Sequence, residues 1–298
     1  MGATFSTLYK KDFKDHPLLA RLLELHKVPE QLHIQGILPD VTLDEYGRGT
    51  PRILTIVGSR KNTTYGKHVL TTLISSLKGY DIVILSGLAL GIDGLAHKEA
   101  LRNDIRTIAI PGSGLSPNVI YPPSHKHLAQ DIVGYGGALI SEIDNNTRAA
   151  PWTFPQRNRI MAALSDALLV IEAEEKSGTL ITARLALELG KDIGAIPGEI
   201  FSPTSSGTNM LIHEGAYPIT SATDLLNLLH LSKKSEHKET NSLSPEEERL
   251  LHLLREPCDK DSLFAQSNMT FETFLSTYSS LEIQGLIEET FGEVRRLV

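Results

Sequence analysis

Short apolar runs alternate with helix-like stretches between Arg52 and Ser221. The runs carry Ile, Val, Leu or Ala at consecutive positions, which is typical of strands buried on both faces of a sheet. They predict strands at Ile53–Val57, Ile82–Leu85, Thr107–Ile110, Ala138–Ser141, Ala167–Glu172, Ile193–Ile196 and Tyr217–Thr220. The stretches between them predict helices at Tyr65–Leu77, Gly91–Leu101, Lys126–Val133, Gln156–Leu164, Thr179–Leu189 and Thr208–Glu214.

This alternation predicts the fold class. Strands and helices that follow one another in strict order form a mostly parallel sheet with helices on both faces. We therefore expect an α/β protein with an extended, Rossmann-like, doubly wound sheet over residues 53–230. Residues 1–52, with helix-like Pro17–His26 and strand-like Gln31–Ile37, are expected to pack on it as an N-terminal extension.

A small second domain is expected after a polar linker. Residues 231–241 contain few apolar side chains and predict the linker. The domain covers residues 242–298, and its first helix opens at Ser244 with Pro245 and the capping-box residue Glu247. Further helices at Lys260–Gln266 and Phe271–Gln284, then strands at Leu286–Thr290 and Glu293–Leu297 joined at Phe291–Gly292, predict a winged-helix-like fold.

The charge is distributed unevenly along the chain. The 298 residues have a formal net charge of -7, so the molecule as a whole does not attract polyanions. Residues 241–298 hold 11 acidic and 5 basic residues, whereas residues 1–230 hold 23 and 21. Any nucleic-acid site is therefore expected to be a local patch on the larger domain, and the winged-helix-like domain is expected to contact protein and not duplex DNA.

Cysteine content and hydropathy indicate the compartment. The single cysteine, Cys258, can form neither an internal disulfide nor a thiolate metal site, which favours a reducing environment. The sequence has no apolar run of the roughly 18 residues that a membrane span requires, and no secretory signal pattern. We therefore expect a cytoplasmic protein without a membrane partner.

The loops after the first two strands are the first candidate sites, because parallel α/β sheets bind ligands at the carboxyl ends of their strands. Gly58-Ser59-Arg60 follows the first strand, and a loop containing Gly87 and Gly91 follows the second. Neither loop has the GxGxxG pattern of a dinucleotide site. The glycines either let backbone amides approach a phosphate or only allow tight turns and close packing.

A third candidate is Lys176-Ser177-Gly178-Thr179, at the start of a predicted helix. Free amides, two hydroxyl groups and a lysine suit a phosphate at the positive end of the helix dipole. Capping of the helix by Ser177 is the simpler alternative.

The fourth candidate is Phe154-Pro155-Gln156-Arg157-Asn158-Arg159. Pro155 at the first helical position would put both arginines in the opening turn, where the dipole disfavours cations. Either internal carboxylates such as Glu142 and Asp166 neutralise them, or they meet an external anion. Trp152 and Phe154 either stack on a base or pack internally.

No catalytic or cofactor motif is present. The sequence lacks HExxH, a P-loop, a GxSxG elbow and any Cys/His metal spacing. The histidines have no partner that spacing assigns. We therefore expect neither an enzyme nor a cofactor.

These motifs, in this order, resemble the DNA-processing protein A family, also called DprA or Smf. The resemblance covers about Pro17 to Ala222. It rests on the candidate loops above and on Ala96-His97, Tyr121-Pro122, Ser141-Glu142, Glu172-Ala173, Leu180-Ile181-Thr182-Ala183, Pro197-Gly198, Gly207-Thr208-Asn209, Leu211-Ile212 and Gly215-Ala216.

The resemblance implies a binding protein that acts in natural transformation (competence) and DNA recombination. Family members bind single-stranded DNA, protect it from nucleases and help a RecA-type recombinase displace single-strand-binding protein. They also form homodimers through the Rossmann domain. The DNA-binding residues expected here are Ser59, Arg60, Gly87, Gly91, Phe154, Arg157, Asn158, Arg159, Lys176, Ser177, Gly178 and Thr179. Replacing Arg60 or Arg157 with Ala is expected to weaken the binding of single-stranded DNA to the same extent for every base sequence, with little loss of fold.

The sequence departs from the family at two points. After Tyr121-Pro122 the family usually has an Asn before the following Leu, whereas Pro123-Ser124-His125-Lys126-His127-Leu128 stands here, so any role of that Asn is in doubt. The segment before the Rossmann-like region is too short for the N-terminal sterile-alpha-motif-like domain of some members, so we expect the functions of that domain to be absent.

Two alternatives remain. The glycine-rich loops also loosely resemble the phosphoribohydrolases of the lysine-decarboxylase-like group. Thr182 stands where those enzymes carry a Glu, and without a carboxylate the glycosidic chemistry lacks its acid/base group. The other alternative is a protein-interaction scaffold whose arginines form internal salt bridges.

Overall fold

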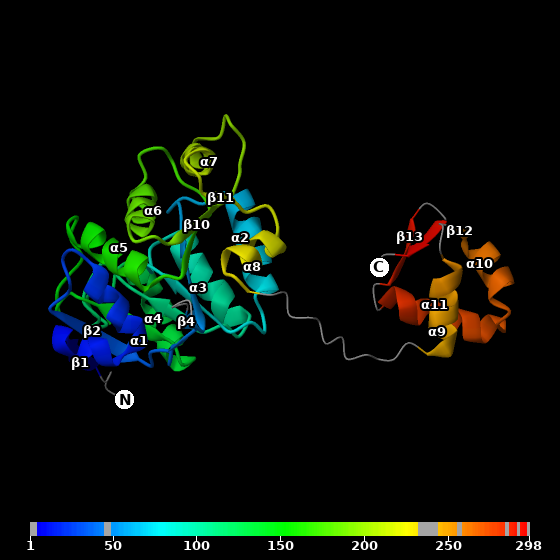
Figure 1. The fold of residues 1–298 in the computed structure, drawn as a ribbon, viewed down its shortest axis with the longest axis horizontal. Coiled ribbons are helices and arrows are strands. Elements are labelled where there is room, and N and C mark those ends of the chain that lie inside the picture. Colours follow the sequence, from blue (N-terminus) through cyan, green and yellow to red (C-terminus); the bar gives the residue numbers. More distant parts are fainter. Residues whose placement is uncertain are drawn as a thin grey trace. The chain divides into compact units, whose positions relative to one another are not determined.

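The chain folds into two compact units, residues 1–233 and 234–298, which are blue to yellow and orange to red in Figure 1. This computed structural model describes residues 5–44, 49–231, 244–254, 258–283, 286–290 and 293–296. Apart from Leu231, the predicted linker 231–241 lies outside these residues, as does the predicted turn Phe291–Gly292.

A mixed sheet forms the centre of the larger unit. Within the described residues it has nine strands in the order β1 (Phe5–Tyr9), β2 (Gln31–Gly36), β8 (Ala138–Ser141), β7 (Thr107–Ala109), β6 (Ile82–Ser86), β5 (Arg52–Val57), β9 (Ala167–Val170), β10 (Asp192–Ala195) and β11 (Tyr217–Pro218). The strands from β8 to β11 are parallel, and β1 and β2 are antiparallel to their neighbours. This confirms the predicted Rossmann-like α/β class.

The sheet is wound in both directions from its middle. Strands β6, β7 and β8 follow β5 on one side, whereas β9, β10 and β11 lie on the other. Strand β9 pairs directly with β5, with Thr55 opposite Leu168. The winding therefore reverses between β5 and β9, which is where doubly wound sheets bind ligands.

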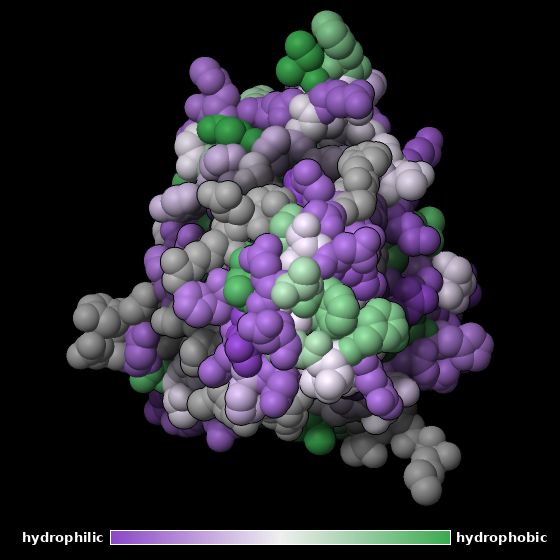
Figure 2. Space-filling view, turned by 90° about the vertical axis from the view of Figure 1, so that its right-hand side faces the viewer, coloured by the Kyte–Doolittle hydropathy of each residue, from purple (hydrophilic) through white to green (hydrophobic). Residues whose placement is uncertain are grey.

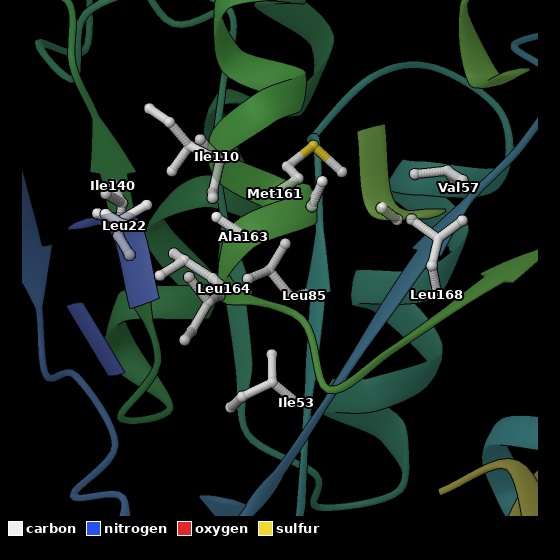
Figure 3. Packing of buried hydrophobic residues seen from close by; sticks show 14 of the residues in the cluster. Leu22, Ile53, Val57, Leu85, Ile110, Ile140, Met161, Ala163, Leu164 and Leu168 are labelled. Carbon is white, nitrogen blue, oxygen red and sulfur yellow. The ribbon is translucent and has the colours of Figure 1, made fainter. Parts of the chain in front are cut away.

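Helices cover both faces of the sheet. They are α2 (Thr64–Ser76), α3 (Ile92–Arg102), α4 (Lys126–Gly134), α5 (Thr153–Leu164), α6 (Gly178–Glu188), α7 (Pro203–His213) and α8 (Ala222–Leu228), with η3 (Pro123–His125) before α4. Successive strand residues point to opposite faces. On β5, Ile53 and Val57 pack in the cluster that includes α5 and α6, and Leu54 and Ile56 pack against α2, α3 and α8. Figure 3 shows the first cluster around Met161 of α5.

The N-terminal extension adds strands to the sheet. It contains β1, η1 (Lys10–Asp15), α1 (Pro17–Ala20), η2 (Arg21–Glu24), β2 and the ribbon of β3 (Thr42–Leu43) with β4 (Gly49–Thr50). The strand-like stretch Gln31–Ile37 becomes β2 and pairs with β8. Strand β1 was not predicted. Phe13, Leu18 and Leu22 complete the core beside α5.

The start of α5 corrects one prediction. The helix begins at Thr153, so Pro155 is its third residue and not its first. Arg157 and Arg159 therefore lie beyond the first turn, and the predicted unfavourable contact with the helix dipole does not apply. The physical reason is that proline is tolerated throughout a first turn, whose amides have no intrahelical partner.

The smaller unit has its own core. Its elements are α9 (Pro245–Leu253), β12 (Cys258–Asp259), α10 (Lys260–Ser267), α11 (Phe271–Ile283), β13 (Ile287–Thr290) and β14 (Glu293–Arg296), with strand order β12-β14-β13. The predicted capping box is confirmed, because the Ser244 amide donates to Glu247 at 2.8 Å and the Glu247 amide donates to the Ser244 hydroxyl at 3.2 Å. Leu250, Phe274 and Tyr278 lie in the core. The winged-helix assignment stays a prediction.

The coloured surface in Figure 2 is mostly polar. Polar residues cover most of the face in Figure 2, where apolar side chains form only small groups. Among the described helices, none is long and apolar enough to cross a bilayer.

Candidate functional site

A cleft of about 410 Å³ opens at the carboxyl ends of β5 and β9, where the winding of the sheet reverses. We call it the switch-point cleft. It is lined by Val57, Gly58, Ser59, Arg60, Lys61, Ala89, Asp93, Phe154, Arg157, Asn158, Met161, Glu174, Ser177, Gly178, Thr179 and Thr182. Most of the predicted site residues therefore come together, although four separate segments supply them.

The loop after β5 forms one wall of the cleft. Ser59 uses its hydroxyl to accept the Lys61 amide at 3.0 Å and its carbonyl to accept the Ile92 amide at 3.1 Å. These bonds hold the backbone of the loop, while the side chains of Arg60 and Lys61 remain exposed. The wall thus presents two exposed cations on a turn whose backbone is held by hydrogen bonds.

Gly91 makes this wall possible. Its φ is +75°, a backbone conformation that suits glycine, and a Cβ there would collide with the Ser59 carbonyl and the Arg60 backbone. Gly87 has a similar role, because a Cβ there would overlap the Arg157 guanidinium and the Asp93 carboxylate. Neither glycine lines the cleft. Of the two alternatives for these glycines, close packing is the one that these contacts match.

Arg60 extends over the aromatic ring of Phe154. The Arg60 Cζ lies 5.1 Å from the ring centroid, a cation–π distance. Phe154 is only partly buried, and its ring meets Tyr121 edge to face with 5.8 Å between centroids. The rim of the cleft therefore combines the cation of Arg60 with the aromatic ring of Phe154. In nucleic-acid sites, cations contact phosphates and aromatic rings stack on bases. Trp152 is 60% exposed and does not line the cleft.

Arg157 forms the floor of the cleft. Its side chain is buried, and Nη1 donates to the Ile110 carbonyl at 2.9 Å. The same atom lies 4.0 Å from the Asp93 carboxylate. Within the described residues its Nε is buried without a hydrogen-bond partner. The neighbouring Asn158 is also buried and lines the cleft.

Burial dominates the ionisation of this pair. It raises the pKa of Asp93, while the Arg157 charge and backbone hydrogen bonds from Ala89 and Gly87 oppose the rise. It also lowers the pKa of Arg157, which the Asp93 charge opposes. Each group therefore depends on the other to remain charged, and an anion beside Arg157 would compete with Asp93.

The opposite wall is the N-terminus of α6. Ser177 caps the helix, with its hydroxyl accepting the Thr179 amide at 3.1 Å. Gly178 is open, with no atom within 4 Å of the position of a Cβ. The Thr179 hydroxyl donates to the Gly58 carbonyl at 3.2 Å and ties this wall to the other. Lys176 is exposed on the same turn but does not line the cleft.

Arg159 points elsewhere. It donates to both carboxylate oxygens of Glu142, at 2.6 and 2.5 Å, and lines a separate cavity with Lys27 and Glu188. Internal neutralisation by Glu142, one of the two alternatives for the arginines, therefore applies to Arg159. Asp166 instead binds Arg21 at 2.9 Å. Only Arg157 of the two predicted arginines reaches the cleft.

Several lining residues were not predicted, among them Lys61, Asp93, Glu174 and Thr182. Lys61 directly follows Arg60, so its basic charge was a usable signal. Asp93 stands two positions after Gly91, but only the fold brings it to Arg157. Glu174 gives the rim an acidic group that spacing did not indicate.

The buried histidines lie outside the cleft. Since the Thr107 hydroxyl donates to the Ile84 carbonyl, it accepts a hydrogen bond from His97 Nδ1, 2.7 Å away. Burial, with the charges of His125 and Arg157, lowers the pKa of His97 to about 3. His125 contacts the Leu88 carbonyl at 2.8 Å. Among the described residues, no group of three or more His, Cys, Asp or Glu side chains gathers to hold a metal ion.

The fold and the cleft define a Rossmann-like α/β protein with a cationic site at its topological switch point. The chain belongs to the family described as DNA recombination-mediator protein A, whose model matches residues 8–230. This membership was predicted from the motifs and is confirmed.

Named relatives agree with this membership. The chain is 43% identical over 176 residues to Protein Smf of Escherichia coli, a match that covers 59% of this chain and 46% of that protein. It is 42% identical over 205 residues to the DNA processing protein DprA of Streptococcus pneumoniae, a match that covers 69% of this chain and 68% of that protein. The chain thus matches less than half of the first relative's length.

Two solved structures share the fold. The X-ray structure of DNA processing protein A from Streptococcus pneumoniae has a TM-score of 0.65 at 37% identity, covering 75% of this chain and 74% of that one. The Helicobacter pylori protein has a TM-score of 0.62 at 30% identity, covering 76% and 96%. That second structure is described as giving insight into a single-stranded DNA binding mode.

Proposed function

We propose that this protein binds single-stranded DNA in the switch-point cleft and acts as a recombination mediator in natural transformation. The observation that carries the proposal is the convergence of Arg60, Lys61 and Arg157 with the N-terminus of α6 in one cleft. Guanidinium groups and helix N-termini are preferred partners of phosphate oxygens. A nearly neutral unit with this local cationic site suits a polyanion better than a neutral ligand.

The shape of the site favours a single strand over a duplex. Phe154 lies on the rim beside Arg60, so a base can stack on its ring while the backbone phosphates meet the cations. Bases in a duplex are already stacked on one another and cannot use such a ring without unpairing. The expected recognition is therefore tolerant of sequence and sensitive to salt.

The proposal includes partners and a place of action. The bound strand is protected from nucleases and passed to a RecA-type recombinase, with displacement of single-strand-binding protein. The protein acts as a homodimer in the cytoplasm, without cofactor and without catalytic turnover. Membership in a family of recombination mediators supports the recombinase as partner.

The smaller unit has a separate role in this proposal. Its acidic composition disfavours duplex DNA, so it contacts protein or regulates. Binding of duplex DNA by the full chain that disappears when residues 242–298 are deleted would contradict this part alone.

Fluorescence anisotropy tests the DNA-binding proposal. The full chain is titrated against a labelled single strand and the matching duplex over a salt series. We expect tighter binding of the single strand, with log K falling by about 0.7 per contacted phosphate for each unit of log salt. Absence of single-strand binding at low salt would refute the proposal and favour the scaffold alternative.

A second assay addresses the enzymatic alternative. Thr182, which lines the cleft, stands where a phosphoribohydrolase would carry its Glu. We expect no release of base from nucleoside monophosphates at high protein concentration. Turnover that is lost in a cleft variant such as Asp93→Asn would establish an enzyme instead.

A further inference from the structure

Tyr121 lies outside the switch-point cleft and packs against Phe154, which lines the cleft together with Arg60. Arg60 lies over one part of the Phe154 ring, and Tyr121 meets the same ring edge to face at an interplanar angle of 61°. The three residues come from the loop after β5, from α5 and from the loop after β7. Tyr121 does not line the cleft, so these three side chains lead outward across its rim.

The ring of Tyr121 is available to a ligand. The side chain is 42% exposed, and its hydroxyl has no hydrogen-bond partner within the described residues. The contact described for this ring is the edge-to-face one with Phe154. An exposed aromatic beside a cationic site matches the arrangement on which successive bases of a single strand stack.

The backbone on either side of Tyr121 is held in place by its neighbours. Ile120 and Pro122, on either side of Tyr121, are buried, and the His125 amide donates to the Pro122 carbonyl at 2.9 Å. The His125 ring also contacts the Leu88 carbonyl at 2.8 Å, which ties the loop to the segment after β6. A stacking surface that is already ordered loses little entropy when a base binds.

We propose that Tyr121 is a second base-stacking residue, which takes the base next to the one on Phe154. The inference rests on the proposed binding of single-stranded DNA in the cleft. Edge-to-face packing at 5.8 Å leaves no room for a base between the two rings, so each ring would take a different base. Tyr121 thereby fixes the side from which the strand leaves the cleft.

The test compares Tyr121→Ala with Tyr121→Phe and with Tyr135→Ala. Tyr135 is a matched control, since it is 71% exposed at the end of α4, which runs from Lys126 to Gly134. Binding to labelled oligothymidine is measured by anisotropy over a salt series. Tyr121→Ala is expected to weaken binding about tenfold without changing the salt slope. Tyr121→Phe and Tyr135→Ala should retain wild-type affinity.

A strand without bases separates stacking from other effects. On an abasic oligonucleotide of the same length, wild type and Tyr121→Ala should bind equally. Two results would overturn the role of Tyr121 while leaving DNA binding by the wild type intact. In the first, Tyr121→Ala and the wild type bind oligothymidine with equal affinity. In the second, Tyr121→Ala loses the same affinity for oligothymidine and for the abasic strand. If the wild type bound neither strand, the proposed function itself would fail. Thermal unfolding of each variant confirms that the fold is retained.

Discussion

The hydroxyl of Thr179, in the first turn of α6, donates a hydrogen bond to the carbonyl oxygen of Gly58 at the end of β5. The two atoms are 3.2 Å apart and both residues are buried. Strands β5 and β9 are neighbours, and each leads into one wall of the cleft. This bond therefore joins the two walls at the point where the sheet reverses its winding.

Thr179→Val removes that bond and keeps the shape of the side chain. We expect a loss of about 1 kcal/mol in the free energy of unfolding, because the Gly58 carbonyl is left without its partner. Single-strand affinity should fall a few-fold as the walls separate. Urea unfolding and anisotropy measure the two effects. Thr179→Ser retains the hydroxyl and should stay close to wild type; if it behaved like Thr179→Val, the bond would not be the cause.

Burial of Arg157 changes what its replacement should do. The sequence alone suggests that Arg157→Ala weakens binding with little loss of fold. In the structure the variant leaves the Asp93 carboxylate buried and uncompensated, so we expect a loss of roughly 3 kcal/mol in unfolding free energy. Urea unfolding measures it. The double variant Arg157→Ala/Asp93→Asn should recover part of this loss, and additive losses would contradict the pairing.

Arg60 is exposed, so its effect should be confined to DNA. Arg60→Ala is expected to reduce the slope of log K against log salt by about 0.7, with a change in stability within about 0.5 kcal/mol. Arg106→Ala is the matched control. Arg106 is exposed directly before β7, at the amino-terminal end of the strand, whereas the cleft lies at the carboxyl ends of the strands. Equal salt slopes for the two variants would remove Arg60 from the site.

Two glycines of the site should respond differently to alanine. Gly91→Ala forces a side chain into a positive-φ conformation and against the Ser59 carbonyl, so we expect a loss of at least about 2 kcal/mol. Gly178→Ala meets open space at a helix start and should leave stability unchanged or raise it by less than about 1 kcal/mol. Thermal and urea unfolding compare them. Similar losses in both variants would contradict the packing role of Gly91.

His97 should make the protein less stable in acid. Its pKa is about 3 in the folded state and 6.5 when unperturbed, so between these values the unfolded chain binds a proton that the folded chain does not. Stability therefore falls as the pH decreases from 6.5 toward 3, by up to about 1.4 kcal/mol per pH unit from this group. Urea unfolding at several pH values should show a shallower dependence in His97→Gln. Parallel curves would mean that His97 is not the linked group.

The positions of the parallel strands β5 to β10 follow from the sequence because each is a short, mostly apolar run that is almost entirely buried. Strand β1 (Phe5–Tyr9) mixes polar and apolar residues at a sheet edge, so only its pairing with β2 identifies it. The sequence also placed the β5 loop and the start of α6 at one site, since carboxyl ends of parallel strands share an edge.

The arginines show the limit of such reasoning. Residues two apart on a helix point in different directions, and the spacing alone could not say which of Arg157 and Arg159 faces the cleft. That choice depends on Glu142, which the fold brings to Arg159 from the end of β8. Likewise the close packing of Gly87 and Gly91 is visible only once their neighbours Arg157 and Ser59 are known.

The two residues joined by the bond between Thr179 and Gly58 are 121 positions apart in the chain. A ribosome that has made only β5 to β8 has produced the first wall without the second, and with it a sheet that ends at β5. The growing polypeptide consequently lacks the second wall of the switch-point cleft until β9 and α6 have left the exit tunnel and docked. The cleft is thus completed only late in synthesis.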